Sequence, residues 1–153
     1  MYVCDYNEER ALGVWVFHGP TSAEEWDKHF RDLQRLTSWH GRVRHRPAVA
    51  MVLLEGAGRP DALTRQKLAT LTALPTYNPY LAIVSASTLV RGVLTALRWL
   101  QKSSFYEVEV FADTVEAIKH LETRRGQPLA ELGPMLKRAQ ATASGGPAGR
   151  LAL

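Results

Sequence analysis

Short apolar runs alternate with capped amphipathic segments along most of the chain. The apolar runs predict strands at Ala11–Phe17, Ala48–Leu54, Tyr80–Ser85 and Tyr106–Phe111. The amphipathic segments that follow them begin with N-cap residues, at Thr21, Asp61, Ser87 and Asp113. Side-chain oxygens of these residue types accept hydrogen bonds from the free N–H groups of a first helical turn. Strand and helix therefore alternate, which is typical of an α/β fold with a largely parallel sheet.

Two further strand patterns indicate how the sheet is ordered. Tyr2–Tyr6 and Ala11–Phe17 flank the polar segment Asn7–Arg10, which predicts an opening β-hairpin. Both faces of Ala11–Phe17 are apolar, so we expect this strand in the centre of the sheet. Polar and apolar residues alternate in Tyr106–Phe111, which predicts an edge strand. We expect a mixed, mostly parallel sheet of about five strands with about four amphipathic helices.

Helical spacing of apolar residues predicts which face of each helix is buried. The first helix can be capped by Thr21 with Glu24 or by Ser22 with Glu25. The third helix, after Ser87, carries an apolar side, and we expect it to pack deeply. The expected buried positions in the four helices are Trp26, Phe30 and Leu33; Leu68 and Leu71; Val90, Val93, Leu94, Leu97 and Leu100; and Val115, Ile118 and Leu121.

The chain of 153 residues is long enough for one domain that buries a core without metal or disulfides. We expect an α/β domain over residues 1–125 and a C-terminal extension over residues 126–153. A weak amphipathic pattern around Leu129–Ala139 predicts a short helix in the extension. The Gly- and Ala-rich end after it predicts a disordered tail.

Composition and cysteine content narrow the class of protein. A hydrophobic content of 46% is ordinary for a globular protein. Cys4 is the only cysteine, which excludes an internal disulfide and favours a reducing compartment. The first residues lack the basic and apolar regions of a signal peptide, and no apolar run approaches the roughly 20 residues that span a bilayer. We therefore expect a cytoplasmic protein with no membrane insertion.

The net charge of +4 is concentrated in the second half, where residues 62–153 carry 11 Lys and Arg against 6 Asp and Glu. Arg42, Arg44 and Arg46 form the densest positive patch, which is either a solvated loop or a contact for a phosphate, a lipid or an acidic partner. Three arginines fall short of the about four to eight typical of membrane-surface clusters, so we predict no tight binding to membrane or nucleic acid. His40 and His45 lie among these arginines without a nearby cysteine or carboxylate, which argues against zinc.

The sequence carries no recognised hydrolase, metalloprotease, nucleotide-binding or redox motif. Loop Glu55–Asp61 follows a strand and opens a helix as a phosphate loop does, but Asp61 occupies the positive helix end that a phosphate would need. His18, at the end of a central strand, is either an acid–base group or a loop histidine bonded to the backbone. Because no carboxylate or nucleophile is connected to it by sequence spacing, we predict no catalytic residue, metal site or cofactor.

Three stretches of the chain carry a family resemblance. Leu12–Ser22 is an apolar strand that ends in a glycine and a short turn before a helix, and Leu81–Leu94 is a strand, a serine-containing turn and a helix that begins with a Val-Arg pair. Glu109–Leu121 is a strand and a helix joined by a Phe-x-Asp turn. In this order the stretches resemble the STAS domain, a family named for sulfate transporters and anti-sigma-factor antagonists, and especially its bacterial antagonist-like members.

The resemblance implies a non-enzymatic regulatory module that binds a protein partner such as a serine kinase, an anti-sigma factor or another switch protein. In the antagonists, a serine that opens the second helix is phosphorylated, and this breaks the partner complex. Ala62 or Thr64 stands at that position here, depending on the alignment, and the glycine of the family's Asp-Ser-Ser-Gly run is missing. Thr64 is thus the candidate phosphorylation site, and we expect constitutive binding instead of a phosphorylation switch.

We expect the partner to bind at the loop Gly56–Asp61, at the start of the second helix and at the turn Ser85–Thr88. The three hydroxyls of that turn either bind an anion or cap the helix. The candidate partner-binding residues are Arg59, Asp61, Thr64, Ser85, Ser87 and Thr88. A lipid or small-molecule carrier with an apolar cleft lined by Trp26, Trp39 and Trp99 is the alternative function. The oligomeric state, a homodimer included, stays open.

Overall fold

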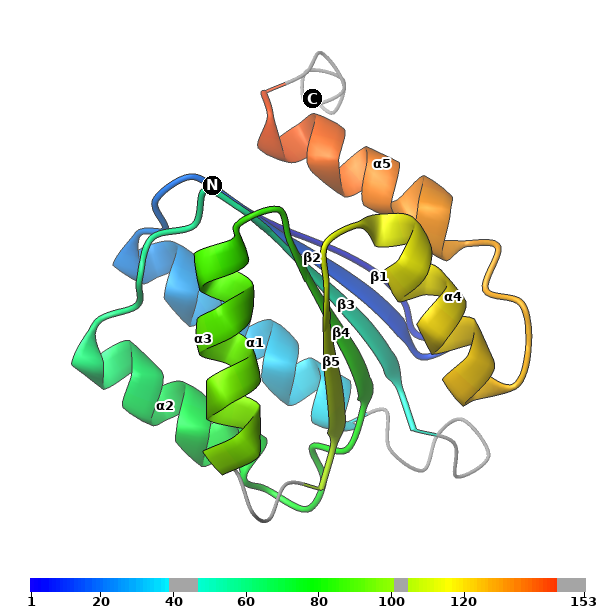
Figure 1. The fold of residues 1–153 in the computed structure, drawn as a ribbon, viewed down its shortest axis with the longest axis horizontal. Helices are drawn as coiled ribbons and strands as arrows, with labels where there is room; N and C mark the ends of the chain where they lie inside the picture. Colours follow the sequence, from blue (N-terminus) through cyan, green and yellow to red (C-terminus); the bar gives the residue numbers. More distant parts are fainter. Residues whose placement is uncertain (39–46, 101–104, 146–153) are drawn as a thin grey trace.

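A five-stranded sheet lies at the centre of the computed structural model, which describes residues 1–38, 47–100 and 105–145 (Figure 1). The strands lie in the order of the sequence and are β1 (Tyr2–Asn7), β2 (Leu12–His18), β3 (Val49–Glu55), β4 (Tyr80–Ser85) and β5 (Glu107–Phe111). β1 is antiparallel to β2, and β3, β4 and β5 are each parallel to the strand before. The expected α/β class with a mostly parallel sheet is confirmed, as are the opening hairpin and the edge position of β5.

Helices cover both faces of the sheet (Figure 1). They are α1 (Ala23–Ser38), α2 (Ala62–Thr72), α3 (Thr88–Leu100), α4 (Thr114–Arg125) and α5 (Leu132–Ala143). The first three connect neighbouring parallel strands and lie on one face, whereas α4 and α5 lie on the other. Right-handed crossovers that always add the next strand on the same side place their helices on one face, which explains this division.

The sheet separates two hydrophobic cores, and β2 contributes to both. Val14 and Val16 point towards α4 and α5. Trp15 and Phe17 point to the opposite face, where α1 buries its apolar stripe. β2 is therefore buried on both faces, as a strand in the centre of the sheet should be.

The helix starts follow the predicted capping chemistry. α1 begins with a reciprocal capping box, in which the Ser22 N–H donates to the Glu25 carboxylate at 2.8 Å and the Glu25 N–H donates to the Ser22 hydroxyl at 3.2 Å. This selects Ser22 over Thr21 as the cap. Asp61 and Asp113 cap α2 and α4 as expected, each with a carboxylate oxygen that accepts backbone N–H groups of the first turn.

Two predicted burials are wrong. Val93 on α3 is 52% exposed and Val115 on α4 is 69% exposed. α3 carries apolar residues on more of its circumference than the sheet can cover, so it does not pack deeply over its described side chains. Val115 belongs to the first turn of α4, which precedes the turns that reach the sheet through Ala117 and Leu121.

The segment after residue 125 completes the core. α5 packs on β1 and β2 over the length of a full helix, beyond the short piece expected around Leu129–Ala139. Its buried side chains are Leu132, Met135, Leu136, Ala139 and Ala143. Arg125 is also buried and donates to the carbonyl oxygens of Pro47 at 2.8 Å and Arg10 at 2.7 Å. The predicted disordered tail after Ala139 is wrong at its start, because α5 continues to Ala143; residues 146–153 of that tail lie outside the described residues.

Candidate functional site

The ends of the parallel strands and the starts of the first four helices lie at one end of the molecule (Figure 1). We call this surface the carboxyl-end rim, formed by residues 18–22, 55–63, 85–89 and 111–115. In open α/β sheets, ligands bind at this end of the strands. The rim contains the predicted partner-binding residues Arg59, Asp61, Ser85, Ser87 and Thr88, and Thr64 lies in the first turn of the helix beside it.

At the start of α2, Asp61 and Thr64 stabilise the helix. The Asp61 carboxylate accepts the Thr64 N–H at 2.7 Å. This backbone hydrogen bond, together with one from the Thr64 hydroxyl, holds the pKa of Asp61 below its usual range. Thr64 itself is only 8% exposed. The candidate phosphorylation site is therefore a buried hydroxyl within a helix cap.

Arg59 precedes this cap in the loop between β3 and α2. Its side chain is exposed, and it forms no ion pair with another residue that the structure describes. Of the predicted residues on this loop, Arg59 is the one whose donors remain available to an approaching carboxylate.

The turn between β4 and α3 is held by an arginine that the functional prediction missed. Arg91 Nη1 donates to the carbonyl oxygens of Ser85 at 2.7 Å and Ala86 at 2.9 Å, and Nη2 donates to Thr88 Oγ1 at 3.2 Å. Ser87 Oγ accepts the Val90 N–H at 3.3 Å and so caps α3. The three predicted hydroxyls are thus brought together, and their described contacts stabilise the turn.

Exposed apolar side chains recur at the rim, and the sequence analysis did not predict them. Leu63, Leu89 and Val115 are 63%, 78% and 69% exposed, and each is the second residue of its helix. A side chain at that position precedes the turns that pack on the sheet. The sequence signal was an apolar residue two places after each N-cap, which periodicity alone assigns to the core.

A histidine–carboxylate pair also lies on the rim. His18 and Glu55 are partners in the parallel register of β2 and β3, and His18 Nδ1 lies 3.0 Å from Glu55 Oε2. Gln140 of α5 donates to the other carboxylate oxygen at 2.8 Å. Because a carboxylate accepts hydrogen bonds, this contact orients the imidazole with its Nδ1 towards Glu55. Among the described residues, no hydrogen bond joins this pair to a serine, threonine or cysteine nucleophile.

Sequence spacing indicates no carboxylate near His18, because the carboxylate that contacts it lies far away in the sequence. His18 and Glu55 are separated by 37 positions, and only the register of neighbouring parallel strands joins them. Two polar residues at the ends of consecutive apolar runs were the signal that could have suggested the pair.

A second polar cluster is buried between β1 and α1. The Tyr2 hydroxyl donates to Asp32 at 2.7 Å and lies 3.3 Å from Nδ1 of His29. Burial lowers the pKa of His29 to about 3 and raises the pKa of the Cys4 thiol to about 12. The imidazole is therefore neutral and the thiol protonated at neutral pH, which makes Cys4 a poor nucleophile.

Trp26 belongs to the aromatic packing around this cluster. Its ring centroid lies 5.7 Å from that of His29, 5.2 Å from Phe17 and 6.2 Å from Phe30. Trp26 thus packs in the core on the α1 face, whereas the carrier alternative placed it in a ligand cleft. The other two tryptophans of that alternative cannot be compared, because Trp39 and the Trp99 side chain lie outside the described residues, as do Arg42, Arg44 and Arg46.

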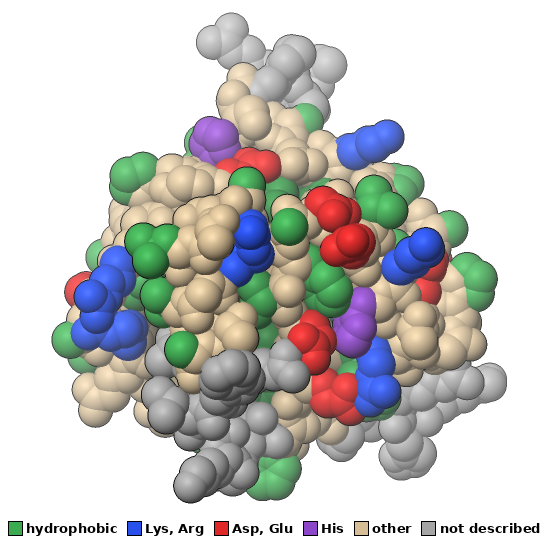
Figure 2. Space-filling model, viewed as in Figure 1, with side chains coloured by type: hydrophobic (Ala, Val, Ile, Leu, Met, Phe, Trp, Pro, Cys, Tyr) green, Lys and Arg blue, Asp and Glu red, His purple; other side chains and the backbone are tan. Residues whose placement is uncertain are grey.

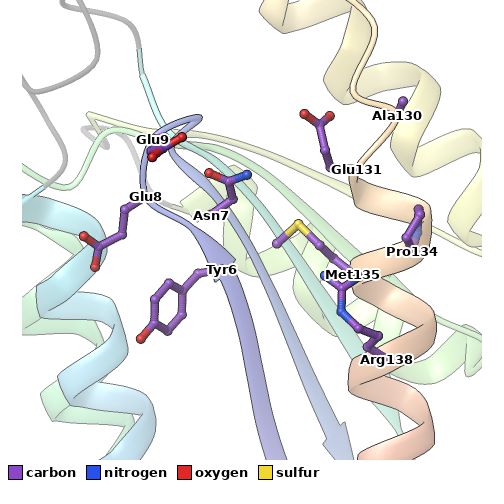
Figure 3. A pocket seen from close by; sticks show the side chains of 9 residues that line it. All are labelled: Tyr6, Asn7, Glu8, Glu9, Ala130, Glu131, Pro134, Met135 and Arg138. Atoms are coloured by element: carbon purple, nitrogen blue, oxygen red, sulfur yellow. The ribbon is translucent and has the colours of Figure 1, made fainter.

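A hollow of about 780 Å³ lies at the opposite end of the molecule, between the hairpin loop and α5 (Figure 3). Its lining includes three carboxylates, those of Glu8, Glu9 and Glu131. Glu131 is paired with Arg10 at 2.5 Å, and Glu8 with Arg35 at 2.5 Å. The lining also includes the apolar residues Ala130, Pro134 and Met135. The charged groups make the hollow less suited to an acyl chain than a wholly apolar surface would be.

Over the described ranges, no group of three or more His, Cys, Asp and Glu is arranged to hold a metal ion. The helices of the same ranges include none with the length and hydropathy of a transmembrane span. Comparisons of the chain with family models, with curated proteins and with solved structures found no match.

Proposed function

We propose that this protein is a non-enzymatic regulatory module of the STAS type and that it binds a protein partner at the carboxyl-end rim. The family resemblance of the sequence supplies the class of partner, a bacterial kinase, anti-sigma factor or other switch protein. The exposed apolar side chains at three helix starts are the observation that carries the proposal.

Leu63, Leu89 and Val115 leave most of their surface in contact with water. Burial of such side chains in an interface contributes about 1 to 2 kcal/mol each, since apolar surface gains about 25 cal/mol per Å². The exposed Arg59 beside the α2 cap adds a charged anchor, a residue type enriched where binding energy concentrates. Apolar contacts together with an arginine suit a protein surface as the ligand.

The burial of Thr64 supports constitutive binding. A kinase needs access to the hydroxyl it modifies, and the Thr64 side chain is covered in the first turn of α2. Its backbone N–H and hydroxyl are both bonded to Asp61. Phosphorylation of Thr64 would therefore require that the cap of α2 first open, which the exposed serine of a phosphorylation switch does not require.

The test is affinity purification of the tagged protein from its native cells, followed by mass spectrometry. Arg59→Glu should abolish recovery of the partner. We expect the Arg59 guanidinium to donate to a carboxylate of the partner, and the glutamate would repel that carboxylate. Its free energy of unfolding should change by less than about 0.5 kcal/mol, as for other exposed residues. Lys119→Glu is the matched control, since it makes the same charge change on the exposed middle of α4.

Equal recovery of the partner by Arg59→Glu and wild type would contradict the location at the rim. An intact-mass measurement of the same wild-type preparation tests the constitutive part of the proposal. A substantial population that carries phosphate on Thr64 would overturn it.

A further inference from the structure

The outward face of α3 is apolar along its described length. Leu89, Gly92, Val93 and Ala96 are all exposed, and their spacing places them on one side of the helix. We call these four residues the α3 stripe. The neighbouring Val90 and Leu94 are only partly exposed and supply the side that packs towards the sheet. An outward stripe without a polar side chain is a candidate interaction surface.

The chain around the stripe is cationic. Residues 56–96 contain four basic residues and a single acidic one, Asp61, whose carboxylate is used as the α2 cap. Of the four basic residues, Lys67 is paired with Asp27 of α1 at 3.5 Å. Arg91 lies next to the stripe, and it donates to two backbone carbonyl oxygens and a hydroxyl, which are neutral acceptors. In Figure 2, hydrophobic side chains with Lys and Arg occupy the surface over α2 and α3, whereas most Asp and Glu side chains in view lie over β5 and α4. Acidic groups therefore complement this face.

The small residues of the α3 stripe help to decide whether a partner helix, a membrane or a second copy of α3 binds there. Gly92 and Ala96 are four positions apart, and a Cβ built at Gly92 would have no atom within 4 Å. Small residues at this spacing let the backbone of a second helix approach closely. They offer little area for insertion into a bilayer, which depends on bulky apolar side chains. A second copy of α3 would bring like charges together, because each would carry Arg91.

We propose that the α3 stripe binds an amphipathic helix of the protein partner, with Asp or Glu residues flanking the apolar face of that helix. Leu89, Gly92, Val93 and Ala96 have the i, i+3, i+4 and i+7 spacing by which amphipathic helices present an apolar face to a partner. This inference rests on the proposed function and extends the binding surface from the rim along α3. Leu89 belongs to both surfaces, since it is the second residue of α3.

The experiment places a photo-cross-linking amino acid at Val93 in the full-length protein, expressed in its native cells. The cross-linked segment of the partner is mapped by mass spectrometry, with a cross-linker at Lys119 on α4 as the control. The cross-linker at Val93 should capture a segment with apolar residues at helical spacing and acidic residues on both sides of the apolar face. The cross-linker at Lys119 should not capture this segment. A basic or non-helical segment would overturn the inference.

Gly92→Leu tests the close approach of the helices. In the unbound protein, a Cβ at position 92 meets no atom within 4 Å. The leucine side chain should nevertheless weaken the binding of a synthetic peptide with the sequence of the cross-linked segment by about tenfold or more. Gly133→Leu on α5 is the matched control, because a Cβ there also meets no atom within 4 Å, and it should leave the affinity unchanged. Equal affinity of both variants would overturn the inference.

The outcomes separate this inference from the proposed function. If wild type recovers a partner that Arg59→Glu loses but Val93 forms no cross-link to it, the inference fails and the proposed function stands. If wild type recovers no partner, both fail. Flotation with phosphatidylserine-containing vesicles that is lost in Gly92→Leu, without any cross-linked protein, would assign the stripe to a membrane and overturn the proposed helix.

Discussion

At the scale of single residues, Gly13 and Trp15 show how closely β2 is packed. The indole of Trp15 lies over Gly13, so a Cβ added at Gly13 would come within 2.7 Å of the ring. Trp15 is fully buried and cannot move away without disturbing the core on the α1 face. Gly13 is therefore required by the tryptophan two positions after it.

Gly13→Ala should lower the free energy of unfolding by about 1 to 3 kcal/mol, the usual cost of forcing extra volume into a packed core. Urea denaturation followed by tryptophan fluorescence measures this change. Gly133→Ala, which adds the same methyl group in open space on a helix, should be neutral or stabilising. A Gly13→Ala protein as stable as wild type would show that the indole can shift.

His29 makes the stability of the protein depend on pH. Burial lowers its pKa to about 3, whereas in the unfolded chain the value is near 6.5. Below pH 6.5 the unfolded chain binds a proton that the folded protein excludes. The contribution of His29 is therefore complete above pH 6.5 and is lost, at up to about 1.4 kcal/mol per pH unit, as the pH falls towards 3.

The measurement is the free energy of unfolding of wild type and His29→Phe between pH 7 and pH 5. The phenylalanine keeps an aromatic ring among Phe17 and Trp26 but cannot bind a proton. Wild type should lose stability more steeply than the variant over this range. Parallel curves would mean that the imidazole reaches water when it is protonated.

At the scale of elements, α3 and α5 carry leucines in opposite environments. Leu132 on α5 is fully buried, whereas Leu89 on α3 is 78% exposed. Leu132→Ala should cost about 2 to 5 kcal/mol through lost burial and the cavity that remains. Leu89→Ala should change stability by less than about 0.5 kcal/mol.

Chemical denaturation of the two alanine variants compares the helices directly. The pair matters because α5 is the helix with the weaker sequence pattern and α3 the one with the stronger. A similar loss in both variants would show that Leu89 packs against the folded protein in solution.

Helix caps and apolar periodicity predicted where the strands and helices lie. The burial of their side chains depends on contacts between residues distant in the sequence, which these local patterns do not show. Asp61 and Asp113 were assigned as caps because an N-cap acts on the turn that follows it. The burial of α5 was underestimated because Gly133 and Pro134 weaken the helical signal while β1 and β2 supply its packing surface. The exposure of Val93 was missed because periodicity finds an apolar stripe without showing whether anything covers it.

The same distinction applies to the candidate site. Arg59 and the hydroxyls of the β4–α3 turn lie on the rim as expected, since both follow the ends of parallel strands. The pairing of His18 with Glu55 could not be predicted without knowing the register of β2 and β3 in the sheet. The role of Arg91 could not be predicted without the folded turn, because its acceptors are two backbone carbonyls and a hydroxyl of that turn.

At the scale of the whole molecule, the two ends of the sheet have different character. The rim combines apolar helix starts with Arg59, whereas the opposite end has a hollow with three glutamates. The α2–α3 face is cationic and the part of the surface over β5 and α4 carries most acidic groups in view (Figure 2). We therefore expect this charge distribution to orient the proposed partner before it makes contact.

The position of α5 against β1 and β2 has a consequence for biosynthesis. A ribosome makes β2 first and α5 more than a hundred residues later. Until α5 emerges, the apolar side chains of Leu12, Val14 and Val16 that it helps to cover stay open to other nascent chains and to chaperones. The protein can fold its βα units in order during translation, but the apolar side chains on this face of β2 are covered only after α5 has been made.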